Sequence, residues 1–223
     1  MEDEYTIDVT PGRRKSRFSK REISDITVAM IVLSVAFMLL YRNGTIMRYL
    51  GQELGDVGKW VGLFATCLAL VFFSFLLHEL GHKFTAQNFG MRSEFRMFPA
   101  GLFITLITSV MGFLFAAPGA VMIEGRADKR ENGIISIAGP AVNIVLAVVG
   151  IAGCLAFNYT PAVLFFLMFA SLNASLALFN LLPIPPLDGS KIWQWNMPVY
   201  VAALLAAVLE MAYIYAWMPD LYY

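Results

Sequence analysis

The run from Trp60 to Leu77 contains no charged residue and is long enough to cross a bilayer as a helix. It leads directly into His-Glu-Leu-Gly-His at positions 78–82, which holds both histidines of the chain. On a helix, the four-residue spacing places His78 and His82 on one face, with Glu79 beside them. Because ionisable groups inside a membrane helix are costly, they indicate a functional site. The run and the two histidines therefore predict a membrane helix that contains part of a functional site.

The pentapeptide has the spacing of the His-Glu-x-x-His motif of zinc hydrolases. In that motif two imidazoles bind the metal and the carboxylate acts as general base. A plainer alternative is a helix end at which the same three side chains meet lipid headgroups and water. Short motifs recur by chance, so the rest of the chain has to decide between the two.

The composition is that of a polytopic membrane protein. Of 223 residues, 59% are hydrophobic and 14% are charged, whereas soluble domains contain about 25% charged residues. The expected fold class is therefore all-α and membrane-spanning. The formal net charge is zero, so nucleic acid is not expected as a partner. Cys67 and Cys154 lie in apolar runs and are expected to be core thiols, not a disulfide or zinc ligands.

Two parts of unequal size are expected along the chain. Residues 1–22 form a cytoplasmic basic tail that contacts lipid headgroups, and residues 23–223 form a single transmembrane domain. The spacing from Ser19 to Glu22 is that of a capping box, which predicts the start of the first helix. The cations of the tail are Arg13, Arg14, Lys15, Arg17, Lys20 and Arg21.

Five membrane spans are expected, together with one apolar segment of uncertain course. The segment 101–117 is either a short span or a hairpin that dips into the membrane. Residues 42–58 contain four glycines and are expected to form a loop or a short interfacial helix. Gly90 is expected to cap the second span. The expected spans are at about 26–41, 60–89, 134–157, 162–182 and 198–217.

A catalytic zinc ion usually takes three protein ligands. With no third histidine and both cysteines in featureless apolar runs, the third ligand is expected to be a carboxylate. Only Asp188 lies where prolines and a glycine break a membrane helix, and such breaks occur against protein or a water-filled cavity. The alternative role for Asp188 is to cap the final helix. The other acidic candidates are Glu94, Glu124, Asp128, Glu131, Glu210 and Asp220.

The motif at 78–82 is followed by Asn-Leu-Leu-Pro-Ile-Pro-Pro-Leu-Asp-Gly at 180–189. This pair resembles the motifs of the site-2 protease family of intramembrane zinc metalloproteases. Gly-Pro-Ala-Val-Asn at 139–143 resembles that family's glycine-to-asparagine motif, and the resemblance covers roughly residues 60–195. It implies that residues 23–223 form one transmembrane metalloprotease domain. The implied ligands of a single Zn2+ are His78, His82 and Asp188, and the implied catalytic base is Glu79.

The two motifs can share a metal only if they lie at the same membrane depth. The histidines lie near the C-terminal end of one span and Asp188 follows the C-terminal end of another, so an even number of crossings separates them. Spans 134–157 and 162–182 supply two crossings, and 101–117 is therefore expected to be re-entrant. This topology places thirteen of the sixteen Lys and Arg residues on one side. The positive-inside rule assigns that side, with the N-terminus and the active-site opening, to the cytoplasm.

Substrate contacts are expected from two further features. Asn143 or Asn180 is expected to hold the substrate backbone or the developing oxyanion, with an interhelical hydrogen bond as an equal alternative for either. For Asn173 the interhelical bond is expected. The segment 95–123 contains many β-branched residues and is a candidate strand-like edge that pairs with an unwound substrate helix. The alternative is a helical hairpin that only packs.

The expected function is that of an intramembrane zinc metalloendopeptidase, which hydrolyses peptide bonds within or near transmembrane segments of membrane-protein substrates. Its expected partners are therefore transmembrane proteins and the lipid bilayer of the cell membrane, and its oligomeric state stays open. The alternative is a catalytically silent scaffold that binds transmembrane helices, although a pure binder has no need of Glu79. A metal-handling membrane protein is a third class, but the spans carry almost no further acids for an ion pathway.

Overall fold

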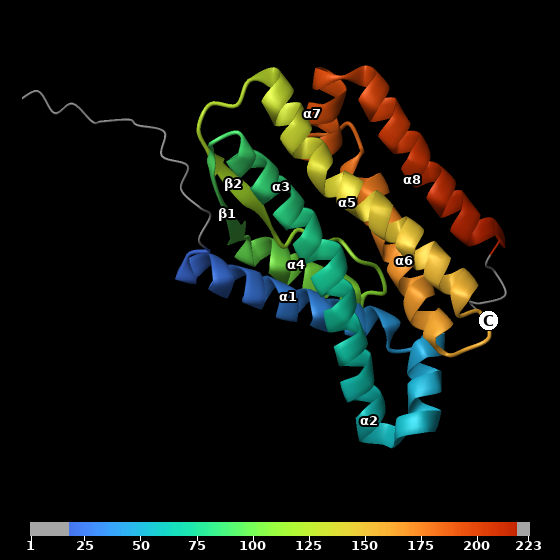
Figure 1. The fold of residues 1–223 in the computed structure, drawn as a ribbon. Helices are drawn as coiled ribbons and strands as arrows, with labels where there is room; N and C mark the ends of the chain where they lie inside the picture. Colours follow the sequence, from blue (N-terminus) through green and yellow to red (C-terminus); the bar gives the residue numbers. More distant parts are fainter. Residues whose placement is uncertain (1–17, 218–223) are drawn as a thin grey trace, which may run out of the picture.

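The structure is a computed structural model that describes residues 18–217, so most of the predicted basic tail lies outside the described residues. The described chain is largely helical and has one small sheet (Figure 1). In chain order the elements are α1 (Lys20–Tyr41), α2 (Thr45–Val71), the π-helical turn η1 (Phe72–Leu76), α3 (Leu77–Asn88), β1 (Arg92–Met97), α4 (Pro99–Val110), β2 (Gly119–Glu124), α5 (Lys129–Ala156), α6 (Ala162–Asn180), α7 (Asp188–Trp195) and α8 (Met197–Trp217).

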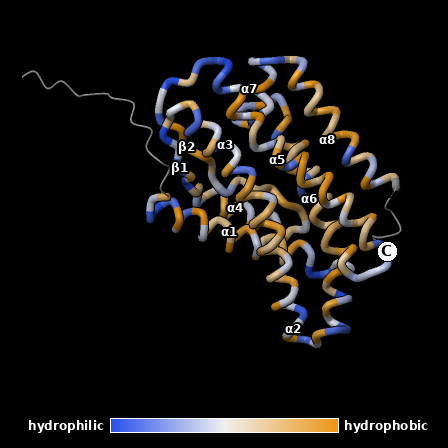
Figure 2. The backbone as a smooth tube through the Cα atoms, in the orientation of Figure 1, coloured by the Kyte–Doolittle hydropathy of each residue, from blue (hydrophilic) through white to orange (hydrophobic). Residues whose placement is uncertain are grey.

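Five helical stretches of the described chain are long and apolar enough to cross a membrane. Figure 2 shows hydrophobic residues along α5, α6 and α8, with hydrophilic residues gathered in the loops that join the helices. The predicted polytopic, all-α membrane fold with about five spans is confirmed. The five stretches are Lys20–Tyr41, Thr45–Asn88, Lys129–Ala156, Ala162–Asn180 and Met197–Ala216.

The chain between the first two spans is more helical than predicted. Instead of a loop or short interfacial helix over 42–58, α2 begins at Thr45. Gly55 interrupts α2 with φ +70° and ψ −171°, a conformation that glycine adopts at little steric cost. As a result, α2 is a helical hairpin whose two legs meet at Gly55 (Figure 1). The second leg continues through η1 into α3, and Gly90, with φ +80°, follows the helix end as predicted.

The segment between α3 and α5 leaves the small sheet and returns to it. β1 pairs antiparallel with β2 over the full length of both strands. The Phe98 N–H then donates to the Pro118 carbonyl oxygen at 2.9 Å. Because β1 and β2 are adjacent, the chain between them, which includes α4, starts and ends beside the same end of the sheet. The segment 101–117 therefore returns to the point where it starts, as a re-entrant hairpin would, and the short β-like element of the predicted fold is present at its two ends.

The strand-like edge predicted for 95–123 is present only at the two ends of that segment, in β1 and β2, and its β-branched middle is helical. Its β-branched residues lie in α4, and hydroxyl groups of that helix satisfy the returning backbone in place of a strand partner. Thr105 Oγ1 lies 3.0 Å from the Phe115 carbonyl oxygen, and the Ala117 N–H donates to the same hydroxyl at 3.3 Å. The β-branched residues concerned are Ile104, Thr105, Ile107, Thr108 and Val110.

Small residues let α5 pack closely against its neighbours α3 and α6. A Cβ on Gly81 of α3 would lie 3.0 Å from the Ala138 carbonyl oxygen, and one on Gly150 would lie 2.7 Å from the Ala170 backbone nitrogen of α6. Interfaces of this kind hold membrane helices together by packing, since lipid gives no hydrophobic drive between them. The contact fixes the face of α3 that carries the histidines against α5. Cys67 and Cys154 are buried free thiols, as predicted.

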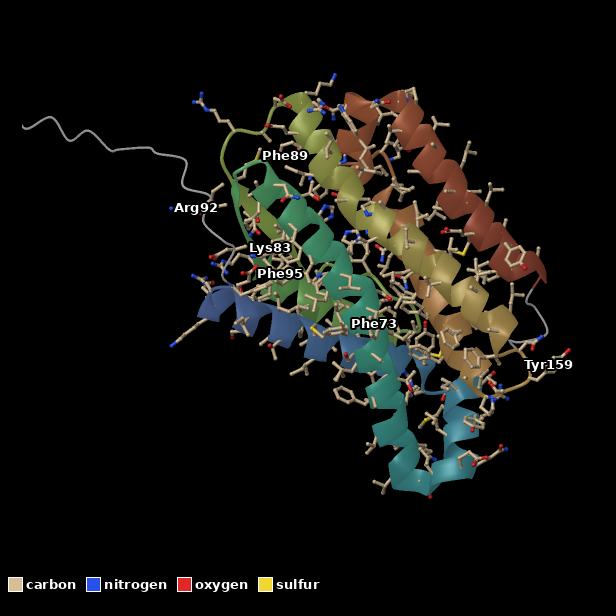
Figure 3. The ribbon with its side chains drawn as sticks, viewed as in Figure 1. Phe73, Lys83, Phe89, Arg92, Phe95 and Tyr159 are labelled. Carbon is tan, nitrogen blue, oxygen red and sulfur yellow. The ribbon has the colours of Figure 1, made fainter. Side chains whose placement is uncertain are left out.

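The first helix begins as predicted, but its capping box is incomplete. Ser19 Oγ accepts a hydrogen bond from the Glu22 N–H at 3.1 Å. The Glu22 carboxylate does not reach back to the cap, because it binds the Lys83 ammonium of α3. A charged donor forms a stronger hydrogen bond than a neutral backbone N–H. Figure 3 shows Lys83 and Phe95 where α1, α3 and β1 meet.

Candidate metal centre

Three donor atoms from two distant parts of the chain converge between α3, α5 and α7. His78 and His82 lie one turn apart on α3, and their Nε2 atoms are 3.0 Å apart. Asp188, the first residue of α7, places Oδ2 3.1 Å from His82 Nε2 and 3.6 Å from His78 Nε2. Among the described residues, these three form the group with metal-ligand spacing.

His78 Nε2, His82 Nε2 and Asp188 Oδ2 form a triangle of donor atoms. This donor triangle fits a zinc ion in size and chemistry. A point about 1.9 Å from all three atoms lies at its centre, close to the zinc–nitrogen and zinc–oxygen distances of about 2.0–2.2 Å. Two imidazoles and one carboxylate also form a common ligand set of catalytic zinc, which leaves the fourth position for water or substrate.

The second nitrogen of each imidazole has a partner that sets the tautomer. His82 Nδ1 donates to the Ile135 carbonyl oxygen at 2.8 Å. His78 Nδ1 donates to Asn143 Oδ1 at 2.5 Å, because the Asn143 amide nitrogen is itself a donor in two other bonds. With both Nδ1 atoms protonated, both Nε2 atoms present lone pairs to the same point. Outer hydrogen bonds of this kind orient metal-binding histidines.

A buried polar network holds Asn143 in place. Its amide nitrogen donates to the Ser74 carbonyl oxygen at 3.0 Å and to Asn173 Oδ1 at 2.8 Å. The Asn173 amide in turn donates to Ser74 Oγ at 2.9 Å. Ser74 lies in the π-helical turn one turn before His78, and π-helical turns are frequent at functional sites. The interhelical hydrogen bond predicted for Asn173, and offered as an alternative for Asn143, is therefore present.

Asp188 is directed at the histidines by the way α7 begins. The N-cap of α7 is Leu187, and the final helix is α8, so the alternative role of Asp188 as the cap of the final helix is wrong. Gly189 allows this start, because a Cβ there would lie 2.2 Å from the Leu181 carbonyl oxygen. Burial raises the pKa of the Asp188 carboxyl group, but His82 and His78 lower it by more, so the pKa lies below its usual range. The carboxyl group is therefore an anion, as a metal ligand must be.

Gly139 of α5 forms the wall of the site behind the two imidazoles. A Cβ at this position would lie 2.3 Å from His82 Nε2 and 2.6 Å from His78 Nε2. No side chain larger than hydrogen fits without displacing the metal-binding atoms. Lack of space for a side chain therefore explains why position 139 of the 139–143 motif is glycine. The asparagine of the same motif contacts His78.

Glu79 lies beside the histidines on the side of the small sheet. Its carboxylate lies close to the Val121 backbone in β2, and Asp188 and Lys191 are near enough to interact with it electrostatically. A carboxylate next to the donor triangle but outside it is positioned to exchange protons with a ligand of the metal.

Of the predicted site residues, the structure brings together His78, Glu79, His82, Asp188 and Asn143. Asn180 instead donates to the Leu176 carbonyl oxygen of its own helix at 2.9 Å, so a substrate contact by Asn180 stays a prediction. Sequence reasoning missed Ser74 and the Ile135 carbonyl. Ser74 had a signal, as a polar residue one turn before His78 in a charge-free run, whereas a backbone carbonyl has none.

Comparison with known proteins agrees with this arrangement. The model of peptidase family M50 matches residues 66–161 and 156–202. MJ0611 of Methanocaldococcus jannaschii is 36% identical over 204 residues, which cover 90% of this chain and 98% of that protein. YwhC of Bacillus subtilis is 33% identical over 160 residues, 63% of this chain and 73% of its own. Rip2 of Mycobacterium tuberculosis is 30% identical over 190 residues, which cover 77% of this chain and 73% of that protein. No solved structure gives a significant match.

All three relatives are named as zinc metalloproteases. The family match includes both histidines, Glu79 and Asp188, and so spans every element that meets at the donor triangle. The chain therefore belongs to peptidase family M50, the site-2 protease family, and is a zinc-dependent metalloprotease.

Proposed function

We propose that this metalloprotease cuts peptide bonds within or near transmembrane segments of membrane-protein substrates. The observation that carries the proposal is the position of the donor triangle, which is built on helices that continue into apolar membrane-crossing stretches. A substrate has to reach His78 and His82 from the bilayer or from its surface. Membrane proteins are the substrates that supply peptide bonds there.

In this proposal His78, His82 and Asp188 hold the zinc ion and Glu79 is the catalytic base. When bound, zinc lowers the pKa of a water molecule and polarises the scissile carbonyl group. Glu79 takes the proton from the attacking water and passes it to the leaving amine. Asn143 acts on this step through His78, whose ring it orients.

The outer edge of β2 is the proposed docking strand for the unwound substrate. In an antiparallel pair, hydrogen-bonded and non-hydrogen-bonded residue pairs alternate. Since Phe98 bonds Pro118, the register puts Val121 at a position whose N–H and C=O point away from β1. That edge faces Glu79. An extended substrate paired with it would pass the catalytic base.

The outer edge of β1 is already occupied, which favours β2. The Phe95 N–H donates to the Glu22 carboxylate at 2.9 Å, and the Ser93 carbonyl oxygen accepts from Lys83 at 2.8 Å. A strand cannot be added to β1 without breaking both bonds. Within the segment 95–123 predicted to pair with the substrate, β2 is therefore the proposed edge.

The proposed orientation has the N-terminus and the opening of the site towards the cytoplasm. Its support is the excess of Lys and Arg, thirteen of sixteen, on the side of the loops that flank the site. Cysteine accessibility at Arg126→Cys and Arg48→Cys in whole cells tests it, with the first expected to be shielded from an impermeant reagent and the second labelled.

A cleavage assay in liposomes with a model transmembrane substrate tests the proposal as a whole. Glu79→Gln should abolish cleavage and retain one zinc per chain, whereas Asp188→Ala should lose zinc. Val121→Pro should impair cleavage and retain zinc, because it removes an outward N–H that the paired substrate would use, and Val121→Ala is its matched control. Wild-type protein that binds zinc but cuts nothing across a substrate panel would overturn the proposal and favour the scaffold.

A further inference from the structure

An open cavity of about 490 Å³ lies between the two legs of the α2 hairpin and the end of α1. Three cationic side chains line it: Arg42, Arg48 and Lys59. They are the only Lys and Arg residues of the stretch 22–82. α1 connects the two regions, because Glu22 near its start reaches the residue after His82 and Arg42 follows its last residue. The cavity is therefore at the end of α1 remote from the metal centre.

The cavity lies where the chain enters and leaves the apolar layer. Arg42 directly follows the first span, and Trp60, which also lines the cavity, begins the charge-free run of the second. Tryptophan and arginine are typical of the membrane–water boundary, at the level of the lipid phosphates. Trp60 is 42% exposed and its neighbour Val61 64% exposed, so an apolar surface adjoins the charged one.

The positive charge of the cavity is only partly compensated. Lys59 pairs with Asp56 at 2.7 Å, and the Asp56 side chain is 96% exposed and does not line the cavity. Arg42 donates to the Leu39 carbonyl oxygen, and Arg48 donates to Thr45 Oγ1 at 3.4 Å. Both of these acceptors are uncharged. A guanidinium has five N–H donors, so most donors of the two arginines remain for an anion.

We propose that this cavity binds the phosphate group of an anionic phospholipid from the surrounding leaflet. Two arginine forks and one ammonium match the oxygens of a phosphodiester. The acyl chains follow the exposed apolar surface of Trp60 and Val61, where they remain in the bilayer. Clustered cationic side chains near a membrane surface attract anionic lipid headgroups.

The bound lipid would act on the same continuous helix that carries the active site. Its phosphate joins Arg42 after α1 to Lys59 on the second leg of α2, and that leg runs without a break through η1 into α3. The lipid therefore ties the α2 hairpin to α1. The expected consequence is a more stable protein in membranes that contain anionic phospholipid.

Native mass spectrometry of the delipidated full chain, titrated with phosphatidylglycerol or phosphatidylcholine, tests the site. The wild-type protein should hold one phosphatidylglycerol at least about tenfold more tightly than phosphatidylcholine. The triple variant R42Q/R48Q/K59Q should lose that preference. The control R126Q/K129Q/R130Q removes the same charge from the loop before α5 and from the first turn of α5, and it should keep the preference.

Inorganic phosphate at millimolar concentration separates the two sources of the same chemistry. Displacement of the lipid by phosphate assigns the site to the free anion as well, and no displacement assigns it to the lipid. If the triple variant fails to fold, R42K/R48K keeps the charge but loses the forks, and it should weaken the preference severalfold. The proposal would be overturned if the triple variant and the control lost the preference for phosphatidylglycerol equally. It would also be overturned if the triple variant or R42K/R48K kept that preference in full.

Discussion

The Lys83 ammonium lies 2.7 and 2.9 Å from the two carboxylate oxygens of Glu22, and both residues are at most 1% exposed. Lys83 follows His82 directly, so this ion pair connects α3, which carries both histidines, to the start of α1. Lys83 also donates to the Ser93 carbonyl, and Glu22 accepts from the Phe95 N–H. The pair thereby fixes β1, and through β1 the strand β2, relative to the histidines.

Lys83→Met should therefore destabilise the protein by about 3 kcal/mol, because it leaves the Glu22 carboxylate buried without a counter-charge. Unfolding in detergent, followed by circular dichroism, measures the change. The double variant Glu22→Leu/Lys83→Met should recover most of it, since both charges are removed together. Lys59→Met, which breaks the exposed pair with Asp56, is the control and should have no measurable effect on the delipidated protein. Equal stability of Lys83→Met and wild type would contradict the role of the pair.

Asn143→Ala should lower the affinity for zinc by about 10- to 100-fold, because His78 loses the partner that holds its tautomer and orientation. Equilibrium dialysis against a zinc chelator measures the affinity. Asn143→Asp keeps an oxygen acceptor for His78 Nδ1 and should retain more affinity than alanine. Asn173→Ala, one step further from the metal, should cost less than either. An Asn143→Ala protein with wild-type zinc affinity would show that the bond to His78 is dispensable.

Gly139→Ala should prevent zinc binding while the protein still folds. The added Cβ would occupy space 2.3 Å from His82 Nε2, so the imidazoles have to move off the donor triangle. Gly150→Ala on the same helix is the matched comparison, since its Cβ would meet the Ala170 backbone of α6 and not the site. It should lower the melting temperature yet leave the zinc content of the folded fraction unchanged. Zinc content by atomic absorption, measured on the monodisperse fraction, distinguishes the two effects.

The predictions from sequence were most accurate where a pattern is local. Apolar runs located five membrane helices, and the two motifs predicted which side chains meet, because helix geometry and parity constrain both. The prediction for 42–58 failed because Gly55 turns a helix into a hairpin, which glycine content alone does not distinguish from a loop. The β-branched residues of α4 adopt a helix because the Thr105 hydroxyl binds the returning chain. Such long-range bonds have no local signal, and the same holds for Glu22 and Lys83.

Removal of zinc should abolish cleavage and lower the melting temperature of the wild-type protein. A ligand that binds only the folded state stabilises it by about 2.7 kcal/mol at a hundredfold excess over its dissociation constant. Dialysis against a chelator, followed by return of zinc, should therefore lower and then restore both activity and melting temperature. Asp188→Ala lacks one of the three donors, so its melting temperature should respond little to the same treatment. Glu79→Gln should respond like wild type in melting temperature and stay inactive throughout, because Glu79 faces the Val121 backbone and lies outside the donor triangle. A melting temperature of Glu79→Gln that no longer depends on zinc would make Glu79 a ligand and remove it as the base.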